Sequence, residues 1–508
     1  MTDKKNYDSD FCGSLPLHHI NSIQDYGYLL IVDNNLNIIQ LSENVTQLTG
    51  KKLEELINSP LADFIREEDL LKMEGLIQTG IAKRIPLYLQ FNEQEGANLF
   101  LALLHVGADY IIIELEKQEE AQNRSFADVY QEIKYISSAI DQAESVQEVC
   151  TIAIHELRKL SGFDGILMYQ FDRDWNGTVI AEEKDERLDQ YIGQTFPASD
   201  VPKQARQMYL KNPYRLISNR DYEAIRLYPV INPVTNAFID LSDCNLRGVA
   251  KVHLEYMKNM KVKASMSIRV LYNETLWGLI SCHHLEPKYL SYELCSIFEW
   301  LSEVISTKIS LIINKQDYKI IKQIQEKRVA LADLVYAHDD IAMGLLKDDT
   351  VDILQLFNAS GVLIRVNGKL ETKGDVPYKT DLYNLMQWLE SKNLDNVYST
   401  NALSALYEDA AGYPAIASGV LFIPINQTPG DFLVCFRPEA IQSIDWGGDP
   451  NQAINFTADG KKYHPRTSFE LWKQTVEQQA LPWTKNELEV AESLRSFLFE
   501  FTIKQAQQ

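Results

Sequence analysis

The sequence predicts an α+β fold in which three tandem domains, each with an antiparallel sheet, are joined by long helices. Short runs of strand-forming residues fall into three groups, and segments with apolar residues at helical spacing lie before and between these groups. The chain has 508 residues, of which 45% are hydrophobic and 24% are charged. This composition is typical of globular proteins, and the length suits three or four domains.

The first domain is predicted to follow a polar tail and to end near residue 120. Strand-like runs alternate with short helical patches, at 26–33, 85–91, 99–106 and 109–116. The acidic, glutamine-rich stretch 116–125 marks the end of this segment. We therefore expect a compact antiparallel α+β domain.

The second domain is predicted to begin with amphipathic helices, because apolar residues recur at intervals of three and four through 126–140 and 146–162. The strand 165–171 follows. After a loop-rich middle, two strands at 263–273 and 275–284 close the domain, separated by a short Asn-Glu turn. This order predicts a second α+β domain.

A long helix is predicted between the second and third domains. From about Tyr292 to Ala342 the sequence has almost no Gly or Pro, and apolar residues recur at helical spacing. One helix, continuous or briefly interrupted, would span about 70 Å at its usual rise per residue. This length suits signal transmission or dimer contact, and it equally suits a domain's first helix followed by a linker.

The third domain repeats the order of the second, with an entry helix followed by strands and a further helix. These elements are expected at 361–368, 380–391, 420–426 and 431–438. A segment rich in turn-forming residues, 443–469, precedes the last helix. Loops of this length inside a compact domain are usually functional or disordered. The C-terminal helix ends the chain as though a further domain should follow it.

Charge and composition exclude several classes of function. Lys and Arg total 49 against 71 Asp and Glu, so the formal charge is −22 and a nucleic-acid backbone would be repelled. No apolar run approaches the roughly 20 residues that cross a bilayer, and the N-terminus lacks the apolar stretch of a signal peptide, so a cytoplasmic protein is expected. The six cysteines form no CxxC pair, which argues against a zinc site and a disulfide framework.

One short pattern has the spacing of a calcium-binding EF-hand loop, at Asp172, Asp174, Asn176, Gly177 and Glu183. The flanking residues alternate as strands, whereas the calcium loop requires a helix on both sides. We therefore predict a β-hairpin turn here and no metal site.

His155, in the sequence HELRK, has the setting of a histidine-kinase phospho-acceptor, but no glycine-rich nucleotide-binding region follows it. We expect His155 to be a partly buried polar residue on an entry helix. No GxSxG, HExxH or P-loop motif occurs either. The sequence therefore predicts no enzyme activity.

A group of basic, aromatic and small polar residues in the second domain indicates a ligand site. Arg215 and Arg247 can each clamp a carboxylate, so the ligand should be anionic. Ser265 and Ser267 are two apart on one strand, so their hydroxyls face the same side. Walls for a large, flat, partly apolar ligand are expected from Tyr169, Tyr209, Tyr256, His253 and His283. Taken singly, each of these residues is more often structural.

Together these segments resemble the photosensory core of bacterial phytochromes, over essentially the whole chain. The most specific motifs are FPASDVPKQAR at Phe196–Arg206 and the segments Leu246–Val270, Leu276–His284 and Tyr463–Val476. The resemblance implies a tail at 1–20, a PAS domain at 21–120, a GAF domain at 121–300, a PHY domain at 301–490 with a tongue loop at about 436–475, and an output-linker helix at 491–508.

The resemblance implies that biliverdin IXα is bound covalently, through a thioether to Cys12 in the tail. A thiol suits this reaction because it is a soft nucleophile. The neighbours Asp8 and Asp10 disfavour the thiolate, so docking of the bilin should supply the proximity that drives attachment.

The resemblance also assigns roles around the bilin's propionates and pyrrole nitrogens. Arg215 and Arg247 are similar to the propionate-binding arginines, assisted by Tyr209, Ser265 and Ser267. Asp200 resembles the aspartate whose main-chain carbonyl accepts from the pyrrole nitrogens and whose carboxylate faces the tongue.

Further positions are implied along the rings. His253 resembles the histidine stacked near the central pyrroles, and His283 the one bonded to the carbonyl of the outermost ring. Tyr169 and Tyr256 match tyrosines around that ring, which rotates on photoisomerisation. Phe196, at the start of the PASD motif, belongs to the same set of chromophore-binding positions.

The long loop of the third domain resembles the phytochrome tongue. Arg466 resembles the arginine that pairs with the PASD aspartate in one photostate, and Ser468 belongs to the same PRTSF motif. Trp446 begins a WGG element. In family terms the tongue exchanges strand for helix, and the residues after Ser468 include enough helix formers to allow this.

The tail departs from the family pattern at Asp25 and Tyr26, where proline and histidine are usual, so we expect a looser backbone there. The resemblance as a whole implies a red/far-red photoreceptor that forms homodimers and signals to a C-terminal output domain or a response regulator. A histidine kinase and a diguanylate cyclase are both open as outputs. The alternative is a light-independent PAS and GAF sensor of another small molecule, such as a cyclic nucleotide or haem.

Overall fold

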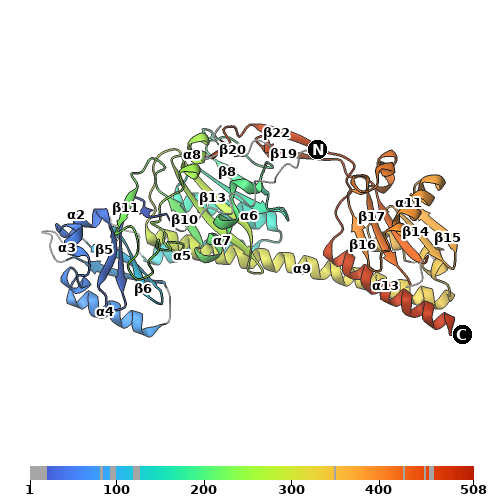
Figure 1. Ribbon diagram of the computed structural model, residues 1–508, viewed down its shortest axis with the longest axis horizontal. Helices are drawn as coiled ribbons and strands as arrows, with labels where there is room; N and C mark the ends of the chain where they lie inside the picture. Colours follow the sequence, from blue (N-terminus) through green and yellow to red (C-terminus); the bar gives the residue numbers. More distant parts are fainter. Residues whose placement is uncertain are drawn as a thin grey trace. The chain divides into compact units, whose positions relative to one another are not determined.

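The computed structural model describes residues 20–80, 84–91, 99–117, 126–347, 351–426, 430–450, 454–456 and 463–507. These residues belong to two compact units. The first contains the chain up to Ile312 together with Asp445–Trp472, and the second contains Ile313–Ile444 and Lys473–Gln508. Three large, mainly antiparallel sheets pack with helices (Figure 1), which confirms the predicted α+β class.

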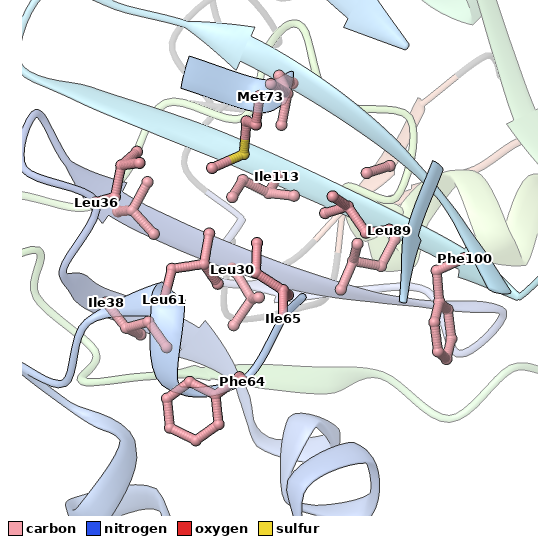
Figure 2. Packing of buried hydrophobic residues seen from close by; sticks show 14 of the residues in the cluster. Leu30, Leu36, Ile38, Leu61, Phe64, Ile65, Met73, Leu89, Phe100 and Ile113 are labelled. Carbon is pink, nitrogen blue, oxygen red and sulfur yellow. The ribbon is translucent and has the colours of Figure 1, made fainter. Parts of the chain in front are cut away.

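The first sheet contains the strands predicted near the N-terminus. In spatial order they are β1 (Ser22–Ile23), β11 (Ile225–Tyr228), β3 (Ile38–Ser42), β2 (Gly27–Asp33), β6 (Tyr110–Lys117), β5 (Leu99–Val106) and β4 (Arg84–Gln90). The accompanying helices are α2 (Thr46–Thr49), α3 (Leu53–Leu56) and α4 (Glu67–Thr79). Met73 of α4 is buried in one core with Leu30 and Ile113 of the sheet (Figure 2).

The N-terminal strand of this sheet is held by two segments of the second domain. Strand β1 pairs with β11, and on its other side Gln24 N donates to the carbonyl of Leu246 at 2.8 Å. At the departure from the family pattern, the Tyr26 hydroxyl donates to the carbonyl of Asn245 at 3.3 Å, and its ring lies 5.4 Å from that of Tyr289. The looser backbone expected at Asp25 and Tyr26 stays a prediction.

The second sheet is the one that carries the ligand cavity. Its strands, in spatial order, are β10 (Tyr214–Ile217), β12 (Ala264–Tyr272), β13 (Thr275–His284), β7 (Gly165–Phe171), β8 (Gly177–Lys184), β9 (Thr195–Phe196), β19 (Gln442–Gly447) and β22 (Leu471–Val476). The turn between β12 and β13 has positive φ at both Asn273 (47°) and Glu274 (63°). Two such residues give the tight turn that matches strand twist, as the Asn-Glu pair predicts.

The EF-hand-like pattern forms the predicted hairpin turn between β7 and β8. Phe171 pairs with Gly177, and Asp172 Oδ1 accepts from the backbone amides of Asp174 and Asn176, each at 2.8 Å. The carboxylate of Asp172 is therefore used by the turn itself. Among the described residues, no cluster of three or more potential metal ligands occurs.

Helices α6 (Val146–Ser161), α7 (Lys203–Lys211) and α8 (Lys251–Asn259) pack with the second sheet, and α5 (Phe126–Gln142) packs on α6. Helix α6 begins with a capping box, in which Ser145 and Glu148 each satisfy the other's backbone N–H, and it ends at Gly162 with φ of 65°. His155 on this helix is exposed and pairs with Glu183 at 2.9 Å. The expectation of a partly buried His155 is wrong, because its side chain lies on the solvent side of α6 with 59% of its surface exposed and reaches Glu183 of β8.

Helix α9 (Tyr292–His338) is a single helix of 47 residues, as the sequence predicts. It ends four residues earlier than expected, where Asp339 takes a positive φ of 49°. Its length is about 70 Å at the standard rise per residue. Among the described residues, none of the helices is both long and apolar enough to cross a bilayer.

The third sheet has the strand order β15 (Lys369–Gly374), β14 (Gly361–Val366), β18 (Phe432–Arg437), β17 (Gly419–Pro424) and β16 (Tyr398–Thr400). Alternate residues of β14 enter two cores. Val362 and Ile364 pack with the end of α9 and with α13 (Lys485–Ala506), whereas Leu363 packs with α11 (Lys379–Ser391). Two short helices, α10 (Ile353–Leu356) and α12 (Pro414–Ala417), complete this domain.

Two of the expected domain limits fall inside helices. Residue 300 lies within α9, and residue 490 lies within α13. Helix α13 contributes Ala491, Leu494 and Phe501 to the third domain's core. Residues 491–501 of the expected output-linker helix therefore also take part in that core.

The turn-rich segment expected as a tongue forms strands. Besides β19 and β22 it contains β20 (Ile454–Phe456) and β21 (Tyr463–Pro465), which pair with each other. Trp446 of β19 pairs in parallel with Thr195 of β9, so the second sheet continues into this segment. Asp445–Trp472 accordingly belongs to the first unit.

Candidate functional site

A cavity of about 230 Å³ lies in the first unit, between the second sheet and helices α7 and α8. Its walls include all eleven residues that the sequence assigns to a chromophore pocket: Tyr169, Phe196, Asp200, Tyr209, Arg215, Arg247, His253, Tyr256, Ser265, Ser267 and His283. Pro465 of β21, in the segment Asp445–Trp472, also lines the cavity. Cys12 lies outside the described residues.

Two guanidinium groups share one side of this cavity. Arg215, on β10, donates to the backbone carbonyls of Asn245 (2.8 Å), Gly248 (3.0 Å) and Arg247. Arg247 is 7% exposed, and its Nε has no hydrogen-bond partner among the residues that the structure describes. Burial and the nearby Arg215 charge lower the pKa of Arg247 to about 9. A buried guanidinium with an unused donor beside a second, half-buried one suits an anionic ligand.

Strand β12 supplies hydroxyl groups on the same side. Ser265 and Ser267 both line the cavity, as their spacing of two residues predicts. Tyr209 of α7 adds a further hydroxyl to the cavity wall. With the two arginines, these groups form a polar patch that can bind carboxylates.

Two neutral histidines lie on the cavity wall. His253 keeps exposed surface because it faces the cavity, yet desolvation by the surrounding protein and the Arg215 charge lower its pKa to about 4. Desolvation and His253 lower the pKa of His283, also to about 4. Both imidazoles are therefore uncharged at neutral pH, and each ring has one N–H donor and one acceptor to offer a ligand.

The opposite end of the cavity is aromatic. Tyr169 and Phe196 pack edge to face with ring centroids 5.6 Å apart. The Tyr256 ring packs edge to face on Phe469 at 5.1 Å, and its hydroxyl donates to Asp200 Oδ2 at 3.0 Å. Tyr256 therefore links the cavity wall to both Asp200 and the segment Asp445–Trp472.

The tongue residues named from the sequence have different settings. Arg466 is buried and donates from Nη2 to Asp200 Oδ1 at 2.7 Å. Trp446 is buried beside β9. Ser468 is exposed, and its hydroxyl accepts from the amide of Glu470 at 3.3 Å. Neither Trp446 nor Ser468 lines the cavity.

Sequence reasoning missed the methionines of the wall. Met257 on α8, Met260 directly after the end of α8, and Met208 of α7 all line the cavity. A signal existed, because Tyr256, Met257 and Met260 lie three, four and seven residues after His253 and so share its helix face. Soft, flexible thioethers suit contact with an extended conjugated ligand.

Comparison with known families agrees with this geometry. The model described as PAS fold matches residues 12–118, the GAF domain model matches 145–309, and the phytochrome region model matches 323–507. The three matches cover most of the chain in the order that the sequence analysis expects.

Individual relatives match along nearly the whole chain. Cyanobacterial phytochrome B of Nostoc is 34% identical, with 98% of this chain and 66% of the relative covered. A bacteriophytochrome of Pseudomonas aeruginosa is 30% identical, with 97% of this chain and 67% of the relative covered. The chain thus spans about two thirds of the length of these relatives.

A solved structure has the same fold. The Stigmatella aurantiaca phytochrome photosensory core module superposes with a TM-score of 0.83 at 33% identity, covering 97% of this chain and 98% of that one. Sequence, domain order and cavity agree, and the chain belongs to the phytochrome family of photoreceptors, with PAS, GAF and PHY domains.

Proposed function

We propose that this chain is a red/far-red photoreceptor that binds biliverdin IXα in the cavity of its GAF domain and is joined to it by a thioether from Cys12. When bound, the bilin supplies a conjugated system that absorbs light and isomerises. The observation that carries the proposal is the Arg215 and Arg247 pair, because a buried guanidinium with an unused Nε is costly unless an anion occupies the site.

In this proposal the polar end of the cavity binds the propionates, and the aromatic end contacts the ring that rotates. Arg215 and Arg247 bind the propionates, and Tyr209, Ser265 and Ser267 orient them through hydroxyl hydrogen bonds. His253 and His283 are neutral, so each can donate to a carbonyl or accept from an N–H without adding charge. Tyr169, Phe196 and Tyr256 provide the wall against which a ring moves.

The signal leaves the cavity through Asp200 and Arg466. A shielded guanidinium–carboxylate pair is strong enough to favour one of two arrangements of a loop, and its loss would release Asp445–Trp472 from the GAF domain. The signal then reaches a C-terminal output domain in a homodimer. The cytoplasm is the expected location.

The test is to express the full chain with biliverdin and record difference spectra after red and then far-red illumination. A far-red band that bleaches reversibly is expected. A colourless protein would overturn the proposal.

The attachment is tested by Cys12→Ala, which should abolish the covalent adduct seen by zinc-induced fluorescence on a denaturing gel. The same variant should keep absorbance before denaturation, because the cavity is intact. An undiminished fluorescent band would show that another thiol forms the bond. Cys150→Ala, on the far helix α6, is the matched control and should leave the band unchanged.

A further inference from the structure

The side chain of Phe196 contacts both the cavity and the segment Asp445–Trp472. It lines the cavity, and at 2% exposure it is almost fully buried. Its ring packs edge to face on Tyr169 and on Tyr191, each with centroids 5.6 Å apart. On a further side it contacts the segment Asp445–Trp472. The ring therefore has little room to move without displacing a neighbour.

The contact with that segment is made at Gly447. A methyl group added to Gly447 would lie 2.5 Å from Cζ and 2.6 Å from Cε1 of the Phe196 ring. Carbon atoms do not approach so closely without contact, so the ring fills the space that any larger residue would need. The φ of Gly447 is not in the left-handed region, unlike that of Gly448 at 105°. Glycine is thus required at 447 for the close approach and not for the backbone conformation.

Neighbouring interactions hold this contact in place. The preceding residues Trp446 and Thr195 form a parallel β-bridge. Arg466 Nη1 donates to the carbonyl of Gly447, and its guanidinium carbon lies 5.7 Å from the centre of the Phe196 ring. The β-bridge between Trp446 and Thr195 and the hydrogen bond from Arg466 therefore hold Gly447 against the ring of Phe196. The ring cannot shift without moving β19.

We propose that Phe196 and Gly447 form a steric link between the cavity and the segment Asp445–Trp472, acting beside the Arg466–Asp200 ion pair. This inference rests on the proposed photoreceptor function. The ion pair depends on the charges of Arg466 and Asp200, whereas the contact between the Phe196 ring and Gly447 depends on the volumes of the side chains at these two positions. A change in cavity shape that displaces Phe196 by a fraction of an ångström moves Gly447, because close-packed interiors are stiff. Phe196 is a positioning residue in this scheme.

The decisive variants are Gly447→Ala, Phe196→Leu and the double variant. Overpacking by one methyl group should shift the thermal reversion rate after illumination about 10-fold. Leucine lacks the Cζ and Cε atoms that meet the methyl group, so the double variant should return to within about 3-fold of Phe196→Leu. Gly75→Ala, on the open surface of α4 with no atom within 4 Å, is the matched control and should change nothing.

A second readout does not depend on light. Limited proteolysis within Asp445–Trp472 of the bilin-free protein should be about 10-fold faster in Gly447→Ala and restored in the double variant. Unchanged reversion and proteolysis in Gly447→Ala would overturn the link, as would a double variant that behaves as the sum of two independent defects. If every protein, including the unmodified chain, stays colourless with biliverdin, the photoreceptor proposal fails, and the proteolysis alone decides whether Phe196 and Gly447 are coupled.

Discussion

Arg466 and Asp200 form a buried ion pair although they are 266 residues apart in the chain. Their side chains are 3% and 8% exposed, and the atoms Nη2 and Oδ1 are 2.7 Å apart. Asp200 also accepts from the Tyr256 hydroxyl, and Arg466 donates from Nη1 to Gly447. One guanidinium thus joins the PASD turn, the cavity wall and β19.

Replacing Arg466 by alanine should leave the resting spectrum nearly intact and destabilise one photostate. The change removes the cation from a buried carboxylate, which typically costs about 3–5 kcal/mol. If this cost falls on one photostate, the dark reversion rate should change by about 100-fold or more, since about 1.4 kcal/mol corresponds to a factor of ten. Arg466→Lys keeps the charge without the planar fork and should be intermediate. Reversion kinetics equal to those of the unmodified protein would contradict a role for the pair.

Arg247→Gln should have opposite effects on the empty and the loaded protein. Without ligand, the change removes a buried cation that lies near the half-buried Arg215, so the bilin-free protein should gain stability by about 1 kcal/mol. With biliverdin, the change removes a charged hydrogen bond, so affinity should fall by about 1.5–3 kcal/mol. Thermal unfolding with and without biliverdin measures both effects. A loss of stability in the empty protein would argue that Arg247 is mainly structural.

Glu116 should make the stability of the first unit depend on pH near neutrality. Desolvation raises its pKa to about 7, against the opposing hydrogen bond from Tyr289 at 2.7 Å; Glu114 and Glu293 raise it further and Arg84 lowers it. Between about pH 4.5 and 7 the folded protein holds a proton that the unfolded chain has lost, so stability falls as pH rises through this window. Urea unfolding at several pH values should show this slope, and Glu116→Gln should reduce it. An equal slope in both proteins would exclude Glu116 as its source.

Arg437→Ala should destabilise the PHY domain by about 3–5 kcal/mol. Arg437 is 4% exposed, pairs with Glu487, donates to the carbonyl of Phe357 at 2.7 Å and stacks 3.7 Å from the Trp483 ring. Its loss would leave several buried acceptors unsatisfied. Arg365→Ala breaks a more exposed pair with Glu390 and should cost at most about 1 kcal/mol. Comparable losses in the two variants, measured by thermal unfolding, would contradict this account.

The sequence predicted long or strongly patterned elements well. The 47-residue helix α9 and the hairpin around Asn273 and Glu274 each have a local signal, either helical periodicity or a turn pair. The cavity residues were assigned through motifs that resemble those of bacterial phytochromes, and the motif Leu246–Val270 alone holds Arg247, His253 and Ser265. Local patterns of this kind need no knowledge of distant partners.

Long-range pairings were not predictable in the same way. Strand β11 has four residues and β9 has two, too few for a periodic pattern, and their partners lie far away in the sequence. The packing of Tyr26 against Tyr289 depends on the same distant contacts. The close approach of Gly447 to Phe196 also leaves no trace in the sequence beyond a glycine, which turns and helix ends use as well.

The inclusion of Asp445–Trp472 in the first unit has a consequence for recombination between related genes. A crossover in the codons of α9 would take the cavity-lining Pro465, with its neighbour Arg466, from one parent and the rest of the cavity wall from the other. In such hybrid proteins, the absorption spectrum and the thermal reversion rate should therefore depend on both parents. A change in either property by recombination would require matched changes in two stretches of the gene that are not adjacent.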